Sequence, residues 1–358
     1  MYFPILKGCL GEWIALENVP ASVRSSVFPT IEIPPVESTF EEELGVVTGQ
    51  KKSVAEHVRH FSKAMTKHLP QHWEFGLDAK RCFRDDKAHA NMYQDLVASA
   101  WASRHLAVPV TGLGRSNTYQ HAIQELLQTN GGKLVLRLSD QELLSPTATQ
   151  RRIDMFAQTF GWRFDRLTVL IDLEQQMRLS LGPIPIAYES FAEVGANIND
   201  FAEVAIVMTS MNDRVTKELK PFQTADVARE DLAIWNQVRA IDSGVRLPQF
   251  GDYGVNSPMY AAVDFRMMTL CGKVRYSLND RWVIFRGKKI EKDDNQFHRL
   301  AQMVTEHSEY FGTDTSWGDR QISDCATLRI GPGTLRNWVS YTLNHHLTNM
   351  PRLLANAA

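Results

Sequence analysis

The alternation of short apolar runs with longer stretches of helical period limits most strongly how this 358-residue chain can fold. Strand-length apolar runs separated by amphipathic helices are typical of a parallel sheet, because each parallel crossover needs a connection about as long as a helix. The first 250 residues contain eight such runs: Phe3 to Leu6, Pro29 to Ile33, Trp73 to Leu77, Ala107 to Leu113, Lys133 to Leu138, Leu167 to Leu173, Val204 to Met208 and Val245 to Phe250.

Seven predicted helices lie between these runs: Glu12 to Val19, Ser53 to His68, Lys87 to His105, Thr118 to Gln128, Thr147 to Phe160, Tyr188 to Val194 and Thr224 to Ile241. Ser145 with Pro146, and Thr224, are helix-start signals, and Gly131 with Gly132 is a stop signal. The polar stretch from Glu37 to Ser53 is expected to be a long loop.

This order predicts an α/β fold, namely a (β/α)8 TIM-like barrel, and it fits that fold's usual length of about 250 residues. An open doubly wound sheet is the alternative. Neither a Gly-x-Gly-x-x-Gly motif nor a P-loop follows any predicted strand, so the nucleotide fingerprints of open sheets are missing.

The last third of the chain has a different pattern and predicts a β-hairpin plus helices packed over the barrel. Two strand-like runs, Cys271 to Ser277 and Arg281 to Gly287, are joined at Asn279 and Asp280. Helices are expected at Asp293 to Tyr310 and at Thr334 to His346, with a loop between them. We place the barrel at residues 1–258 and the extension at 259–358, and we do not expect the extension to fold independently, because no low-complexity linker separates the two.

Composition and charge exclude several classes of protein. The formal charge of -2 gives no global basic field for nucleic acid. No apolar run reaches the length of a membrane span, and the first residues do not resemble a signal peptide. The four cysteines are scattered, which predicts free thiols and no structural zinc site. We therefore expect a cytoplasmic protein without a membrane partner.

Charged residues occur at the carboxyl ends of the predicted strands, which meet at one face of a barrel. They are Lys7, Glu32, Arg137, Asp140, Asp172 and Asp252. Tyr253 follows Asp252 between Gly251 and Gly254, a pattern that also fits an ordinary turn. Mixed carboxylates and cations suit recognition of a phosphate or sugar phosphate, and they suit equally a structural network of ion pairs inside the barrel.

Arginines and aromatic residues alternate in the extension: Arg275, Tyr276, Trp282, Arg286 and Trp317. Asp319, His345 and His346 lie further along the same segment. Arginines can hold phosphates while aromatic rings stack on bases. Aromatic cross-strand pairs with solvated arginines are the structural alternative.

Taken in order, several short motifs resemble the "Beta protein" family of phages and bacteria over nearly the whole chain. The motifs are Tyr2 to Gly8 with Gly11 and Glu12, Pro29 to Pro35, Phe250 to Gly254, Arg275 with Tyr276, Trp282, Arg286 with Gly287, Ser316 to Asp319, and Asn344 to His346. The resemblance implies no particular activity. Its phage setting suggests a role in phage–host conflict, such as antiviral defence, and its motifs single out Lys7, Glu12, Glu32, Asp252 and Asp319.

The leading hypothesis is a barrel that binds a phosphorylated ligand, either a nucleotide or a nucleic-acid end. Any catalysis would be metal-assisted phosphoester hydrolysis, with Glu32, Asp172 and Asp252 as base or as ligands of Mg²⁺ or Mn²⁺. The predicted ligand-binding residues are Lys7, Arg137, Tyr253, Arg275, Tyr276, Arg286, Trp317, Asp319 and His345. The alternatives are a non-catalytic scaffold that binds a protein partner, and a glycoside hydrolase that uses Glu32 with Asp172 or Asp252.

Overall fold

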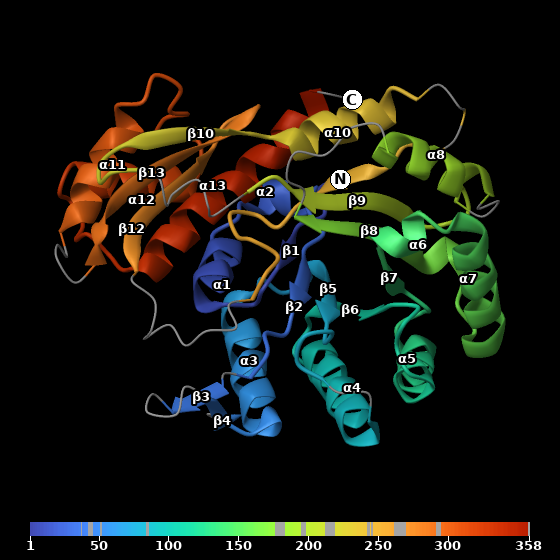
Figure 1. Ribbon diagram of the computed structural model, residues 1–358. Coiled ribbons are helices and arrows are strands. Elements are labelled where there is room, and N and C mark those ends of the chain that lie inside the picture. Colours follow the sequence, from blue (N-terminus) through green and yellow to red (C-terminus); the bar gives the residue numbers. More distant parts are fainter. Residues whose placement is uncertain are drawn as a thin grey trace.

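A sheet of eight parallel strands forms the centre of the molecule (Figure 1). The computed structural model describes residues 1–36, 38–41, 46–50, 52–83, 86–175, 183–194, 198–211, 219–241, 244, 246–260, 270–290 and 295–356. The strands, in spatial order, are β1 (Ile5–Leu6), β2 (Thr30–Glu32), β5 (Glu74–Asp78), β6 (Leu106–Thr111), β7 (Leu134–Ser139), β8 (Leu167–Gln175), β9 (Glu203–Thr209) and β11 (Gln249–Gly251). Each of the eight predicted strands is confirmed in part of its range, although β1 begins only at Ile5 and β11 only at Gln249; position 245 lies outside the described residues.

The two edges of this sheet are joined to each other. The amide of Phe3 donates to the carbonyl of Phe250 at 3.0 Å, and the amide of Ile5 donates to the carbonyl of Asp252 at 2.8 Å. Gly251 lies at this seam, where a Cβ atom would collide with the carbonyl oxygen of Phe3. The predicted TIM-like barrel is therefore confirmed, and its closure depends on a glycine.

Helices surround the sheet, as the apolar periodicity predicted. They are α1 (Leu10–Glu17), α2 (Ala21–Arg24), α3 (Val54–His68), α4 (Lys87–Ala102), α5 (Asn117–Thr129), α6 (Asp140–Leu143), α7 (Pro146–Phe160), α8 (Pro183–Val194) and α10 (Glu230–Arg239). Ser53 and Ser116 cap α3 and α5 by accepting a backbone N–H with the side-chain oxygen, and Pro146 lies in the first turn of α7. None of the helices that the structure describes is long and apolar enough to cross a membrane.

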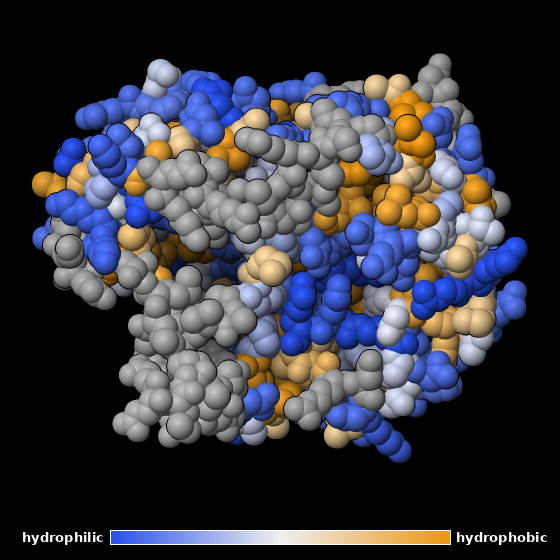
Figure 2. Space-filling view, viewed as in Figure 1, coloured by the Kyte–Doolittle hydropathy of each residue, from blue (hydrophilic) through white to orange (hydrophobic). Residues whose placement is uncertain are grey.

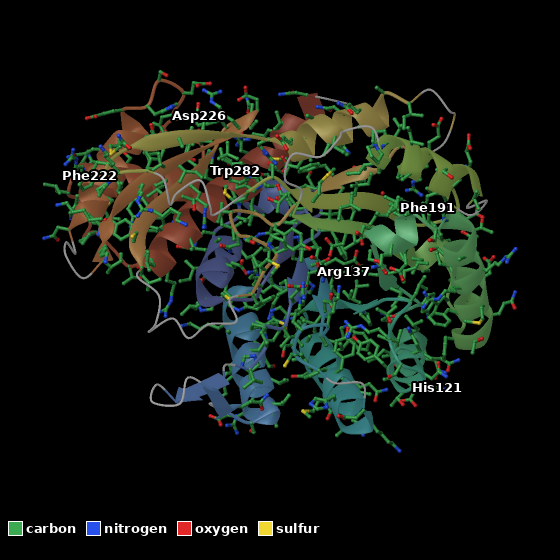
Figure 3. All side chains as sticks on the ribbon, viewed as in Figure 1. His121, Arg137, Phe191, Phe222, Asp226 and Trp282 are labelled. Atoms are coloured by element: carbon green, nitrogen blue, oxygen red, sulfur yellow. The ribbon has the colours of Figure 1, made fainter. Side chains whose placement is uncertain are left out.

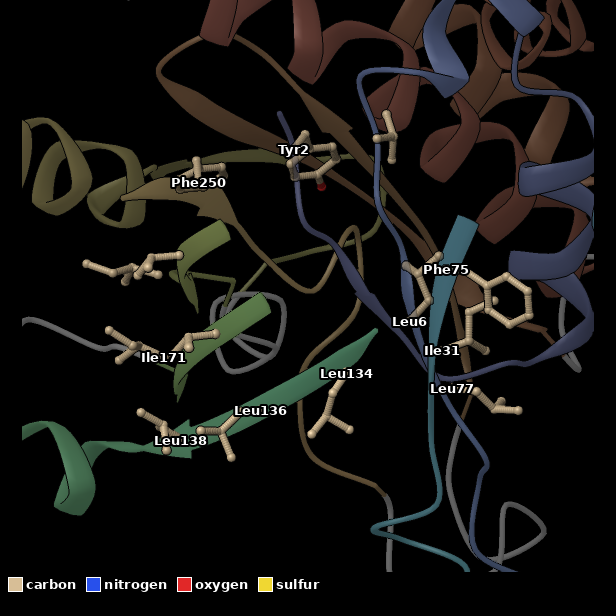
Figure 4. Close-up of a cluster of buried hydrophobic side chains, with 14 of the residues drawn as sticks. Tyr2, Leu6, Ile31, Phe75, Leu77, Leu134, Leu136, Leu138, Ile171 and Phe250 are labelled. Atoms are coloured by element: carbon tan, nitrogen blue, oxygen red, sulfur yellow. The ribbon is translucent and has the colours of Figure 1, made fainter. Parts of the chain in front are cut away.

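Side chains alternate between two layers along each strand. Leu134, Leu136 and Leu138 of β7 point outward into the large core between the sheet and its helices, part of which Figure 4 shows. Val135 joins the smaller core inside the barrel. Arg137 has the parity of Val135, so it also points inward.

The extension forms a second, smaller unit beside α1. Its sheet has the order β10 (Thr224–Ala228), β13 (Arg281–Lys289), β12 (Cys271–Ser277), so it also includes one strand from before residue 259. This sheet packs with α11 (Gln296–Thr305), α12 (Trp317–Ala326) and α13 (Leu335–Asn356) around a separate core. The predicted hairpin of β12 and β13 is confirmed. Helix α13 packs along α1, so the extension lies at the seam side of the barrel (Figure 1).

Three local predictions were wrong. The helix expected from Thr224 begins only at Glu230, because residues 224–228 form β10 and pair with β13. The stretch expected as a long loop contains an antiparallel pair, β3 (Ser38–Glu41) and β4 (Val46–Gln50). Helix α12 occupies part of the loop expected before the last helix. Strand partners that lie far away in the sequence leave no local periodic signal, which explains the first error.

Candidate functional site

The guanidinium group of Arg137 is the centre of a buried charged network at the mouth of the barrel. Its Nη1 donates to Glu32 Oε1 at 2.6 Å and to Asp78 Oδ2 at 2.7 Å. Its Nε donates to Asp172 Oδ2 at 2.8 Å, and its Nη2 donates to the hydroxyl of Tyr253 at 3.1 Å. Glu32, Asp78 and Asp172 lie on strands, and Tyr253 follows β11. Their inward-facing positions gather them around Arg137, which Figure 3 labels.

The second oxygen of each carboxylate in this network is also satisfied. Asp172 Oδ1 accepts from the Tyr253 hydroxyl at 2.6 Å, and Glu32 Oε2 accepts from the Tyr260 hydroxyl at 3.0 Å. Asp78 Oδ1 accepts from Arg115 Nη2 at 2.9 Å and from the amide of Lys80 at 2.8 Å. Buried carboxylates are stable only when paired in this way.

The electrostatics of the network agree with its geometry. Burial alone would raise the pKa of Asp78, but Arg137 and Arg115 hold that pKa below its ordinary value. Among the residues that the structure describes, no group of three His, Cys, Asp or Glu side chains is arranged to hold a metal ion. Glu32 and Asp172, which the sequence pattern assigned to a metal, direct their oxygens at Arg137 and at tyrosines instead.

A cavity of about 490 Å³ opens above this network, at the carboxyl ends of β5 to β8. Figure 2 shows hydrophilic residues gathered over the middle of the face on which Figure 3 labels Arg137. The lining residues are Asp78, Lys80, Thr111, Gly112, Leu113, Gly114, Arg115, Arg137, Leu138, Ser139, Asp140, Glu142, Asp172, Leu173 and Glu174. None of the described residues of the extension lines this cavity.

Of the cations that line the cavity, Lys80 has the fewest contacts with other described residues. Within the described part of the chain its ammonium group forms no hydrogen bond or ion pair, whereas Arg115 contacts Asp78. Partial desolvation, with the charge of Arg137 nearby, lowers the pKa of Lys80. Beside it, Gly114 leaves open space where a Cβ would project, and the loop leads into the amino terminus of α5.

Asp252 lies in a different network, on the outside of the barrel wall. Its parity is that of Phe250, which packs in the outer core. Asp252 Oδ2 contacts Arg229 Nη2 at 3.1 Å and His346 Nε2 at 2.9 Å, and Oδ1 accepts from the Tyr2 hydroxyl at 2.5 Å. The structure therefore does not bring Asp252 together with Glu32 and Asp172; Asp252 joins the extension to the barrel.

Three of the residues predicted in the extension meet in its interior rather than at the cavity. Asp319 accepts from the hydroxyl of Tyr276 at 2.7 Å, and its other oxygen lies 2.8 Å from His345 Nδ1. Arg275 donates to the carbonyl of Val255 at 3.0 Å, Arg286 lies against Cys271, and Trp317 packs edge-on against Tyr341. These six residues do not line the mouth cavity.

Lys7 and Glu12 fasten the loop that follows β11. The ammonium of Lys7 donates to the carbonyl of Met259 and lies 4.5 Å from the centre of the Tyr260 ring. Glu12 accepts from Asn256 and from the amide of Lys7, both at 2.6 Å. Lys7 thus contacts Tyr260, whose hydroxyl donates to Glu32 of the Arg137 network, but Lys7 does not line the cavity.

The sequence pattern missed Asp78, Lys80 and Arg115. Asp78 carries the same signal as Asp172, an acid that ends an apolar strand, but the predicted strand was ended one residue too early, at Leu77. Lys80 and Arg115 stand in loops just after β5 and β6, where the fold itself places ligand-binding residues. Extending every predicted strand end by a few residues would have found all three.

Comparison with known proteins identifies one family. The sequence model described as Beta protein matches residues 2–352. None of the curated proteins compared with the chain matches it.

Proposed function

The chain belongs to the Beta protein family, and we propose that it binds a phosphorylated ligand, such as a nucleotide or a phosphorylated nucleic-acid end, in the cavity at the mouth of its barrel. The observation that carries this proposal is Lys80, a cation without an ion-pair partner among the described residues, on the wall of a cavity of about 490 Å³. A cavity of this size suits a small ligand.

Two further features support an anionic ligand. Arg115 lies on the same wall, held by Asp78 and by the face of the Tyr119 ring, 4.8 Å from the guanidinium carbon. The amino terminus of α5, a helix of 13 residues, begins directly after this loop and contributes a partial positive charge. Arg115 and the amino terminus of α5 both follow the end of β6 directly. The strand therefore fixes their positions, and they require little rearrangement when a ligand binds.

The Arg137 network supports this function as a rigid and neutralised floor. The carboxylates of Glu32, Asp78 and Asp172 would repel a phosphate if they were unpaired, and Arg137, Arg115 and Arg81 offset their three charges. Metal-assisted hydrolysis has less support, because each oxygen of these carboxylates already accepts a hydrogen bond, and the described residues include no group of three metal-ligating side chains. A glycosidase pair of Glu32 and Asp172 also has less support, because Glu32 is completely buried and does not line the cavity.

Binding of AMP and of inorganic phosphate, measured by isothermal titration calorimetry, tests the proposal with wild type and Lys80→Met. We expect binding to wild type and a loss of at least about tenfold in the variant, because an ion pair within a cavity contributes about 1.4 kcal/mol or more. Lys67→Met is the matched control, since Lys67 is an exposed residue in the last turn of α3 and does not line the cavity.

A short oligonucleotide with and without a 5′-phosphate separates a nucleic-acid end from a free nucleotide. Preference for the phosphorylated oligonucleotide over AMP indicates a nucleic-acid end. If no phosphorylated probe binds to wild type, or if Lys80→Met and Lys67→Met have equal affinities, the proposed function is wrong.

A further inference from the structure

The charges on the cavity wall are divided according to strand order. Lys80 and Arg115 follow β5 and β6, whereas Asp140 and Glu142 follow β7, and Glu174 lies at the end of β8. Asp78, Arg137 and Asp172 also line the cavity, but they are paired with one another. Because β5, β6, β7 and β8 are neighbours in this order, the remaining charges form a cationic half over β5 and β6 and an anionic half over β7 and β8. Neighbouring strands lie about 4.8 Å apart, so the centres of the two halves are separated by about 10 Å.

The acidic half contains two carboxylates, Asp140 and Glu174, that each keep one oxygen without a hydrogen-bond partner among the described residues. Among the described residues, Asp140 Oδ1 accepts only from the adjacent amide of Gln141, and the Asp140 side chain is exposed. Glu174 contacts Arg81 at 3.4 Å, and its side chain is 45% exposed. Glu142, in contrast, is engaged by the amide and the hydroxyl of Ser139.

The backbone at Glu174 directs this side chain to the cavity. The pairing of β8 with β9 shifts register between Asp172 and Gln175, and Glu174 has φ of 53°. A residue other than glycine adopts this conformation at a cost of about 1 kcal/mol. Asp172 Oδ1, already bound to Tyr253, accepts the amide of Glu174 at 3.0 Å, which ties the acidic half of the wall to the Arg137 network.

We propose that the ligand carries a vicinal diol in addition to its phosphate, as a ribose phosphate or a nucleotide does, with the phosphate at Lys80 and Arg115 and the diol donating to Asp140 and Glu174. This inference rests on the proposed function. Acidic residues alone would be a solvated surface, but these two share one cavity with the phosphate-binding half and can therefore select which phosphorylated ligand binds. Carboxylates are good acceptors for paired hydroxyl donors, and a nucleoside monophosphate spans the distance between the two halves.

AMP and 2′,3′-dideoxyadenosine monophosphate test the diol directly, because they share the phosphate and the base. We expect wild type to bind AMP about a hundredfold more tightly than the dideoxy compound, since each of the two charged hydrogen bonds contributes a factor of about ten. Asp140→Asn and Glu174→Gln should each reduce this ratio toward one while leaving the affinity for the dideoxy compound unchanged or higher. Glu193→Gln, an exposed change on α8 outside the cavity lining, should keep the wild-type ratio.

The outcomes separate the two proposals. Equal affinities of wild type for AMP and the dideoxy compound, with both dependent on Lys80, overturn the diol and leave phosphate binding in place. If both Asp140→Asn and Glu174→Gln keep the wild-type ratio of affinities for AMP and the dideoxy compound, the assignment of the diol to these two residues is also overturned, because the diol would then be recognised elsewhere. If neither compound binds to wild type, phosphate binding fails and the diol fails with it. Preference for glucosamine 6-phosphate over glucose 6-phosphate that depends on Asp140 would replace the diol by an ammonium group.

Discussion

At the scale of single residues, Arg137 holds three carboxylates that could not otherwise be buried together. Replacing it by methionine leaves Glu32, Asp78 and Asp172 without their shared cation, and breaking a buried ion pair from one side costs about 3–5 kcal/mol. We therefore expect Arg137→Met to lose about that much free energy of unfolding in urea titrations followed by circular dichroism. Arg137→Lys should lose less, because it keeps the charge but not the fork of donors. A loss below about 1 kcal/mol in Arg137→Met would contradict this role.

The residues of the network show what a sequence can predict at this scale and what it cannot. Glu32, Arg137 and Asp172 were found because each is a charge within an apolar strand. Whether these side chains point into the barrel depends on their position in the alternation along the strand, and an error of one residue in the strand register reverses the answer. Asp252 was misplaced for this reason: Gly251 and Tyr253 take the inward positions, so Asp252 points outward to Arg229 and His346. The partner Arg229 had no signal, because it lies where a continuous helix was expected.

At the scale of elements, the closure of the barrel depends on the seam between β1 and β11. Gly251→Ala would push a Cβ into the carbonyl oxygen of Phe3 and the side chain of Val207, in a part of the sheet that cannot yield without breaking the seam. We expect a loss of about 3 kcal/mol in free energy of unfolding, at the upper end for overpacking. Gly114→Ala is the matched control, since its Cβ would meet open space, and it should leave stability within about 0.5 kcal/mol. Equal melting curves for the two variants would show that the seam is not rigid.

The sequence predicted helices and strands correctly where the spacing of apolar residues along the chain distinguishes a helix from a strand. Eight strands and most helices follow from alternation of apolar residues and from capping signals such as Ser53 and Ser116. Strand β10 could not be predicted in this way, because its exposed and half-buried residues alternate weakly and its partner β13 lies far along the chain. The error matters for function, since β10 connects the barrel to the sheet of the extension.

At the scale of the whole molecule, the extension is held to the barrel by a buried contact between His346 and Asp252. The groups that face the His346 ring are Asp252, Arg229, His345, Tyr2 and the ring of Trp282. Neutral His346 donates from Nε2 to Asp252, and its Nδ1 has no hydrogen-bond partner among the described residues. Protonation would place an unpaired N–H donor in the core, which agrees with burial as the main cause that lowers the pKa of His346.

This pKa gives the molecule a predictable response to pH. The pKa of His346 in the folded state lies below the ordinary 6.5, so below pH 6.5 the unfolded chain binds the proton more readily than the folded chain. The stability that His346 contributes is therefore fully present above pH 6.5 and is lost as the pH falls. We expect the difference in free energy of unfolding between wild type and His346→Gln to be constant from pH 7 to 8 and to shrink by up to about 1.4 kcal/mol per pH unit below 6.5, in urea titrations between pH 5 and 8. A difference that grows toward acid pH would mean that His346 is protonated and paired with ionised Asp252, and the contact between barrel and extension would then be an ion pair that strengthens at acid pH.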